Sequence, residues 1–168
     1  MESELKAMGH GIKQRDCVRM TDTEVTDFLA TQRTMTMATL NADSTIHLVA
    51  MWYGVLDGKV VLESKAKAQK VTNLRRNPTM SILVEAGETY DQLRGVQIAG
   101  TATIVEGLDA MWPAGVAIFE RYNGPYTPER VAGVKAMLHK RVIVELQPTR
   151  VTSWDHRKLG LPPMPVHA

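Results

Sequence analysis

The densest chemical feature of the sequence is a basic segment that begins at Glu63 and ends at Arg76. No acidic residue occurs from Ser64 to Val84, and the cations of the segment are Lys65, Lys67, Lys70, Arg75 and Arg76. The segment follows a predicted strand and opens a predicted helix over about residues 66–76. Amides at the N-terminus of a helix attract anions, and the serine hydroxyl and the lysines add donors and charge. The segment therefore predicts a phosphate cradle, with a solvated basic helix face as the alternative.

Nucleic-acid binding is a second interpretation of the same basic segment, and the sequence disfavours it. No aromatic residue that could stack on a base lies between Tyr53 and Tyr90. No motif of a nucleic-acid-binding domain accompanies the segment, and the net charge of the chain is only +2. We therefore expect no nucleic-acid partner.

Other kinds of site chemistry have little support. The chain contains neither a Gly-x-Ser-x-Gly nucleophile motif nor a glycine-rich nucleotide loop. His47 has no second histidine or cysteine at metal-ligand spacing, so we predict no metal site. The single cysteine, Cys17, is interpreted as an incidental thiol. If the protein is an enzyme, a cofactor is expected to carry the reaction.

The elements that must position the basic segment begin with two predicted hairpins. A strand over residues 35–40 is followed by turn residues and a longer strand over residues 45–55. The long strand has one face with His47, Val49, Met51 and Tyr53 and another with Ile46, Leu48, Ala50 and Trp52. Because both faces are largely apolar, both are expected to be covered. The Asp57-Gly58 pair predicts a two-residue turn into a strand over residues 60–64.

The rest of the chain alternates strands and helices. Thr21 and Glu24 have the spacing of a capping box for a helix over about residues 22–33. The further predicted elements are strands at about 80–84 and 96–104, helices from about 109 and from Thr127, and a last strand over 141–154 that is broken near Pro148. These are about six strands, mostly joined as hairpins, which favours an antiparallel barrel because closure removes exposed edges.

A length of 168 residues fits one domain. The sequence predicts an N-terminal extension over residues 1–20, a cofactor-binding domain over 21–155 and a proline-rich tail over 156–168. The first twenty residues lack the apolar core of a signal peptide, and no apolar run approaches the roughly 20 residues of a membrane helix. We expect a cytoplasmic protein without a membrane partner.

Five stretches of sequence resemble a known family, the pyridoxamine 5′-phosphate oxidase-like FMN-binding split barrels. They are residues 38–43, 47–53, 57–58, 70–78 and 80–84. The nearest branch is the actinobacterial flavin/deazaflavin oxidoreductases of group B, and the resemblance covers about residues 21–155. It implies a mainly β fold with α insertions, a six-stranded antiparallel split β-barrel of Greek-key topology with flanking helices. It also implies a homodimer with two cofactor sites across the interface.

The resemblance also implies site residues. Those that match the ring-binding strand of the family are His47, Val49, Ala50, Met51 and Trp52. Those that match its phosphate-binding region are Glu63, Ser64, Lys65, Lys67 and Lys70. The usual cofactor of this branch is coenzyme F-420, with FMN in other branches. A lysine-rich cradle suits the longer and more anionic tail of F-420.

The implied function is an F-420-dependent oxidoreductase that transfers a hydride between the reduced coenzyme and a small electron-poor substrate. The alternatives are an FMN-dependent oxidase or reductase of the same fold, or a non-catalytic F-420 carrier. Trp154 to Arg157 only faintly match the substrate-phosphate pattern of the vitamin B6 oxidases, so that reaction is not expected. A helical insert over about residues 107–140 either lines the substrate pocket or packs on the barrel. Its aromatic residues are Trp112, Phe119, Tyr122 and Tyr126.

Overall fold

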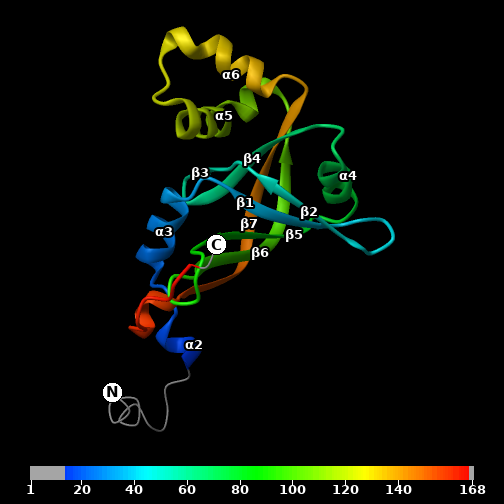
Figure 1. The fold of residues 1–168 in the computed structure, drawn as a ribbon. Helices are drawn as coiled ribbons and strands as arrows, with labels where there is room; N and C mark the ends of the chain where they lie inside the picture. Colours follow the sequence, from blue (N-terminus) through cyan, green and yellow to red (C-terminus); the bar gives the residue numbers. More distant parts are fainter. Residues whose placement is uncertain (1–13, 167–168) are drawn as a thin grey trace.

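The strands of the computed structural model, which describes residues 14–166, form one antiparallel sheet (Figure 1). They are β1 (Met35–Leu40), β2 (Ile46–Met51), β3 (Gly54–Leu56), β4 (Lys59–Lys65), β5 (Thr79–Ala86), β6 (Arg94–Val105) and β7 (Arg141–Asp155). Their order is β2-β1-β5-β6-β7-β4-β3. Strands β5, β6 and β7 form a meander, and β4 pairs with the last of them, which is a Greek-key connection. The predicted mainly β split barrel is confirmed.

Helices flank this sheet. They are α2 (Gln14–Cys17), α3 (Asp22–Thr31), α4 (Gln69–Arg76), α5 (Leu108–Asn123) and α6 (Val131–Leu138), with 3-10 turns η1 (Pro128–Arg130) and η2 (His156–Leu159). The predicted start of the last helix at Thr127 is therefore early by one turn, because Pro128 opens η1 rather than α6. The predicted capping box of α3 is confirmed, since the Glu24 amide donates to the Thr21 hydroxyl at 3.2 Å.

The predicted long strand over residues 45–55 is in fact two strands, which gives seven strands rather than six. Its first part, β2, pairs with β1 as far as Met51 opposite Met35. After Trp52 and Tyr53 the chain changes partner, and β3 pairs with β4 from Gly54 opposite Val61. The two ends of the sheet order are therefore consecutive pieces of one extended segment, and this segment closes the sheet.

The turn between β3 and β4 is the two-residue hairpin that the sequence predicts. Asp57 and Gly58 have φ angles of 50° and 76°. Positive φ at both central residues is the requirement of a type I′ turn, which glycine and aspartate tolerate. The turn fixes the register of β4, and β4 carries the first residues of the basic segment.

The inside of the barrel holds the main apolar core. Met37, Val84 and Val96 on the strands are fully buried there, and Phe28 of α3 closes one end. Tyr53 is also fully buried, and its hydroxyl donates to the Leu29 carbonyl at 2.7 Å. Burial raises the pKa of Tyr53 to about 12, so the phenol stays protonated and remains a donor. The change of strand partner is thus anchored to the C-terminal end of α3.

The helical insert covers the other face of β4 and β7. Val61 and Ile143 point to this face and pack with Met111, Ile118 and Leu138 of α5 and α6. Figure 1 shows these two helices side by side beyond the β3–β4 end of the sheet. The aromatic residues of the insert, Trp112, Phe119, Tyr122 and Tyr126, all contact this cluster. The packing role of the insert is therefore confirmed.

Strand β7 runs through Pro148 instead of ending there. Gly100 pairs with Pro148 while Ala99 pairs with Arg150, so Thr149 is an extra residue. This β-bulge accommodates proline, which has no amide for the ladder. The predicted irregularity near Pro148 is a bulge, and the strand continues to Asp155.

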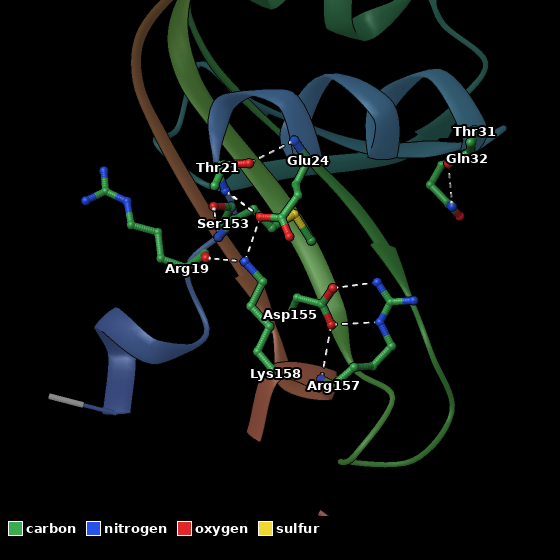
Figure 2. Close-up of polar contacts among 10 residues, drawn as sticks. Arg19, Thr21, Glu24, Thr31, Gln32, Ser153, Asp155, Arg157 and Lys158 are labelled. Atoms are coloured by element: carbon green, nitrogen blue, oxygen red, sulfur yellow. Dashed lines mark hydrogen bonds and ion pairs between the residues drawn. The ribbon is translucent and has the colours of Figure 1, made fainter. Parts of the chain in front are cut away.

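The described part of the predicted N-terminal extension, residues 14–20, lies along the end of β7; residues 1–13 lie outside the described residues. The Asp155 amide donates to the Val18 carbonyl at 2.7 Å, and Met20 is buried. Figure 2 shows Lys158 reaching the Arg19 carbonyl and the Glu24 carboxylate, at 2.8 and 2.6 Å. These contacts join the start of the described chain to its C-terminal end.

Candidate functional site

A groove of about 400 Å³ lies between the end of β2 and the start of α4. We call it the β2–α4 groove, and its lining residues are Ala50, Met51, Trp52, Glu63, Ser64, Lys65, Ala68, Lys70 and Arg141. It brings together members of both predicted groups. The ring-binding group supplies Ala50, Met51 and Trp52, and the phosphate-binding group supplies Glu63, Ser64, Lys65 and Lys70.

Three predicted site residues lie outside the β2–α4 groove. His47 and Val49 point to the same side of β2 as Met51 and are half-buried, and Val49 packs on the barrel core. Lys67 lines a neighbouring cavity of about 680 Å³, which shares Lys65 and Arg141 with the groove. Ala50 and Met51 lie on opposite sides of β2 and both line the groove, so position at the end of the strand decides which predicted residues reach it.

The Ser64 hydroxyl is the most informative atom of the groove. Ser64 is 2% exposed, and within residues 14–166 its oxygen has no hydrogen-bond partner. A buried hydroxyl without a partner loses free energy of about 1–3 kcal/mol relative to a satisfied one. Such groups are rare in folded proteins. Because Ser64 lines the groove, a ligand there could accept or donate the missing hydrogen bond.

The first turn of α4 presents backbone donors to the same place. Ala68 precedes the helix and has no side chain with which to cap it. The amides of the first turn are therefore free of a side-chain acceptor, and they carry the partial positive charge of a helix N-terminus. Val71 and Leu74 are buried and hold α4 against the barrel. The helix is thus fixed with its N-terminus at the groove.

An ion pair and a lysine set the charge of the groove. Arg141 Nη1 lies 2.5 Å from Glu63 Oε2, and both side chains are partly buried. Burial lowers the pKa of Lys70, Glu63 opposes this shift, and Arg141 adds to it. With Lys65 included, three cations surround one carboxylate. The groove therefore favours a ligand with negative charge, which would also relieve the repulsion between Lys70 and Arg141.

The two arginines of the basic segment are bound elsewhere. Arg75 donates to the Ala66 carbonyl at 3.0 Å and forms an ion pair with Glu106. Arg76 donates to the Leu40 carbonyl. Both side chains therefore hold α4 in place and are not in the groove. The cation that the sequence did not indicate is Arg141, which reaches the groove only because β7 pairs with β4.

The aromatic residue among those that line the groove is Trp52. Trp52 is 59% exposed, and its ring stacks on Tyr122 with centroids 4.2 Å apart and planes 6° apart. Tyr122 belongs to α5, and the sequence left open whether it lines the substrate pocket or packs on the barrel. It contacts the lining residue Trp52, so the insert supports the groove without lining it.

The outer face of β2 carries large exposed apolar side chains. Ile46 and Leu48 are 66% and 63% exposed, on the same side of the strand as Ala50. The sequence predicted that both faces of this segment are covered. The core covers the inner face, but the described residues of this chain leave the outer face open.

No helix within residues 14–166 is long and apolar enough to cross a membrane. The same part of the chain contains no cluster of three or more histidine, cysteine or acidic residues that could hold a metal ion.

Comparison with known proteins relates the chain to one family and to several solved structures. The sequence pattern described as pyridoxamine 5′-phosphate oxidase matches residues 21–155. A conserved hypothetical protein from Mycobacterium tuberculosis is 51% identical, with a TM-score of 0.89, over 94% of this chain and 98% of that one. A search of the curated proteins gives no match.

More distant structures share the fold and differ in their ligands. A protein titled F420 reductase is 24% identical, with a TM-score of 0.56, over 74% of this chain and 93% of that one. The heme storage protein HutZ from Vibrio cholerae is 20% identical, with a TM-score of 0.63, over 77% of this chain and 92% of that one. At these identities the likeness shows the fold alone.

Proposed function

The chain belongs to the pyridoxamine 5′-phosphate oxidase family, and we propose that it is an oxidoreductase whose β2–α4 groove binds coenzyme F-420. The phosphate of the tail would lie against Ser64, Lys70 and the first turn of α4. The planar ring would lie along the end of β2, beside Ala50 and Trp52. FMN, which has the same arrangement of ring and phosphate, is the alternative coenzyme.

The observation that carries this proposal is the unsatisfied Ser64 hydroxyl. Ser64 is buried, and it lines the same groove as Lys70 and the start of α4, whose first-turn amides have no side-chain cap. A phosphate oxygen would accept hydrogen bonds from all three, which is the usual chemistry of an anion site at a helix N-terminus. A solvated basic helix face would not require a buried hydroxyl.

The residues of the groove are suited to binding and orientation. Bound deazaflavin supplies the hydride chemistry, which needs no covalent catalytic side chain. The cations would hold the tail, and the tail would fix the position of the ring. Trp52 and Tyr122 would shield one side of the ring site from water. The protein would thus contribute orientation and exclusion of water to hydride transfer to an electron-poor substrate.

The proposal includes a homodimer. Ile46 and Leu48 are large apolar side chains that the single chain leaves exposed on the outer face of β2, the strand that leads into the groove. A second copy that covers this face would bury apolar area and would also approach the groove. Two equivalent sites at the interface follow from twofold symmetry.

The test is a titration of the purified protein with F-420 and with FMN, followed by turnover assays. Colourless protein that changes the fluorescence of F-420 at micromolar concentration supports the proposal, whereas retained yellow FMN supports the alternative coenzyme. Oxidation of reduced F-420 by a quinone or an unsaturated lactone separates an enzyme from a non-catalytic carrier. Binding of neither coenzyme would overturn the proposal.

A further inference from the structure

The hydroxyl of Tyr122 contacts the backbone at the point where the extended segment changes strands. The Tyr53 amide donates to this hydroxyl at 2.9 Å. The hydroxyl oxygen also lies 2.9 Å from the Tyr53 carbonyl and 2.7 Å from the Arg33 carbonyl, each of which can accept its proton. The phenol thus accepts a hydrogen bond from the Tyr53 amide and shares its single proton between the Tyr53 and Arg33 carbonyls.

These contacts replace a missing strand partner. Tyr53 lies between β2, which pairs with β1, and β3, which pairs with β4, and it belongs to neither ladder. Tyr53 is fully buried, so its amide and carbonyl groups need partners within the protein. The side chain from α5 supplies them. The direction of the chain at Tyr53 therefore depends on an atom of the helical insert.

The ring of the same tyrosine contacts the neighbouring residue. Tyr122 stacks on Trp52 with planes 6° apart, and Arg33 Cζ lies 5.6 Å from the Tyr122 ring centroid. Trp52 nevertheless remains 59% exposed, because the stack covers one face of the indole. Tyr122 thus fixes the backbone after Trp52 by its hydroxyl and the plane of Trp52 by its ring.

We propose that Tyr122 is a positioning residue for the ring site, and that it holds the free face of Trp52 ready for a planar aromatic ligand. The inference rests on the proposed function of the groove. It assigns to the insert a role in ring recognition, separate from the recognition of the tail by Ser64 and Lys70. Ring binding and tail binding should therefore respond to different substitutions.

The experiment compares Tyr122→Phe, Tyr122→Leu and the control Tyr126→Phe. Tyr126 belongs to the same insert, but its ring packs edge-on against Trp112 at 6.1 Å between centroids. Three probes are titrated: the complete F-420, its deazaflavin chromophore without the phosphate tail, and inorganic phosphate. Thermal unfolding of each variant is followed in parallel, so that loss of folded protein is measured separately.

We expect Tyr122→Phe to weaken binding of the tail-free chromophore by about threefold to tenfold, the size expected when one hydrogen bond that positions Trp52 is lost. Tyr122→Leu should weaken it further, because the stack is also lost. Binding of inorganic phosphate should not change in Tyr122→Phe, and Tyr126→Phe should resemble the wild type with all probes.

Two results would overturn the inference and leave the proposed function standing. One is unchanged chromophore binding by Tyr122→Phe. The other is a parallel loss of chromophore and phosphate binding, which would mean that Tyr122 only stabilises the fold. If the wild type binds no complete coenzyme, the proposed function fails and the inference fails with it.

Discussion

Glu63 and Arg141 form an ion pair across the β4–β7 ladder, with 2.5 Å between Oε2 and Nη1. The two residues are diagonal neighbours, because Glu63 lies opposite Ile143 and Arg141 lies opposite Lys65. Both side chains line the β2–α4 groove. The Glu63 carboxylate therefore pairs with Arg141, a cation that would otherwise be free to contact an anionic ligand.

The first prediction concerns this carboxylate. Glu63→Gln should increase the affinity for F-420 by about threefold to tenfold, because it frees Arg141 and removes a negative charge near the phosphate. Fluorescence titration at two salt concentrations measures the effect, which should shrink at high salt. Weaker binding would indicate instead that Glu63 contacts the coenzyme directly, as the family resemblance implied.

Ser64→Ala should weaken coenzyme binding without lowering the stability of the fold. The hydroxyl has no partner within the described residues, so its removal should leave the free energy of unfolding unchanged or raise it by up to about 1 kcal/mol. Loss of a hydrogen bond to a phosphate should weaken coenzyme binding by about tenfold or more. Urea unfolding and coenzyme titration test the two halves. A destabilised Ser64→Ala protein would show that the hydroxyl has a structural partner.

The affinity for the coenzyme should decrease at alkaline pH, where Lys70 loses its positive charge. Burial lowers its pKa below the ordinary lysine value of 10.5. An anion favours the charged amine, so affinity should be constant below the lowered pKa and should fall as pH rises through it. Lys70→Ala should bind more weakly at neutral pH and should lack this alkaline fall. Lys67→Ala is the matched control, since Lys67 lies outside the groove, and it should keep the wild-type profile.

A charge on the exposed face of β2 should dissociate the proposed dimer. Leu48→Glu places a carboxylate on a side chain that is 63% exposed in the single chain and would be buried by a second copy. Sedimentation velocity should show a monomer for this variant at concentrations where the wild type is dimeric. Leu161→Glu, on an exposed leucine of the C-terminal segment, should leave the dimer intact. A monomeric wild type would contradict the proposal.

The carboxylate of Asp155 should stabilise the fold at neutral pH. Its side chain is 7% exposed and forms an ion pair with the half-exposed Arg157 at 2.5 Å, as Figure 2 shows. The hydrogen bond from Arg157 lowers the pKa of Asp155. Asp155→Asn should therefore reduce the free energy of unfolding by about 1–3 kcal/mol at pH 7, toward the lower end because solvent screens Arg157.

The loss of stability in Asp155→Asn should depend on pH, because the pKa of Asp155 is lowered in the folded protein. The stabilisation is fully present above the ordinary aspartate pKa of 3.8 and is lost as pH falls through the lowered folded value. The stability difference between wild type and Asp155→Asn should therefore narrow at strongly acidic pH, as urea unfolding would reveal. Asp27→Asn, which changes an exposed carboxylate of α3, should show a much smaller difference at every pH.

Local sequence signals predicted those parts of the fold that neighbouring residues determine. The Asp57-Gly58 turn and the Thr21 capping box are both present, because each depends on residues at most three positions apart. The break at Trp52 and Tyr53 was not predicted. An extended apolar segment has the same pattern whether it keeps one partner strand or changes partners, and only the pairing decides between the two.

In the candidate site, too, the residues that are close together in sequence were predictable and the distant one was not. Ser64 and Lys70 are close in sequence, and the order of strand and helix places them at one helix N-terminus. Arg141 was missed because it comes more than seventy residues later and reaches the groove through strand pairing. In sequence, Arg75 and Arg76 are indistinguishable from the lysines of the segment. In the structure Arg75 pairs with Glu106 and Arg76 donates to the Leu40 carbonyl, so neither contacts the groove.

The passage of one segment from β2 to β3 has a consequence for the integrity of the whole barrel. The two ends of the sheet are joined there by covalent bonds and not by a ladder. A single backbone cut between Trp52 and Tyr53 would leave every strand pair intact, yet it would remove the connection that holds β2 next to β3. Closure of this barrel therefore depends on one peptide linkage.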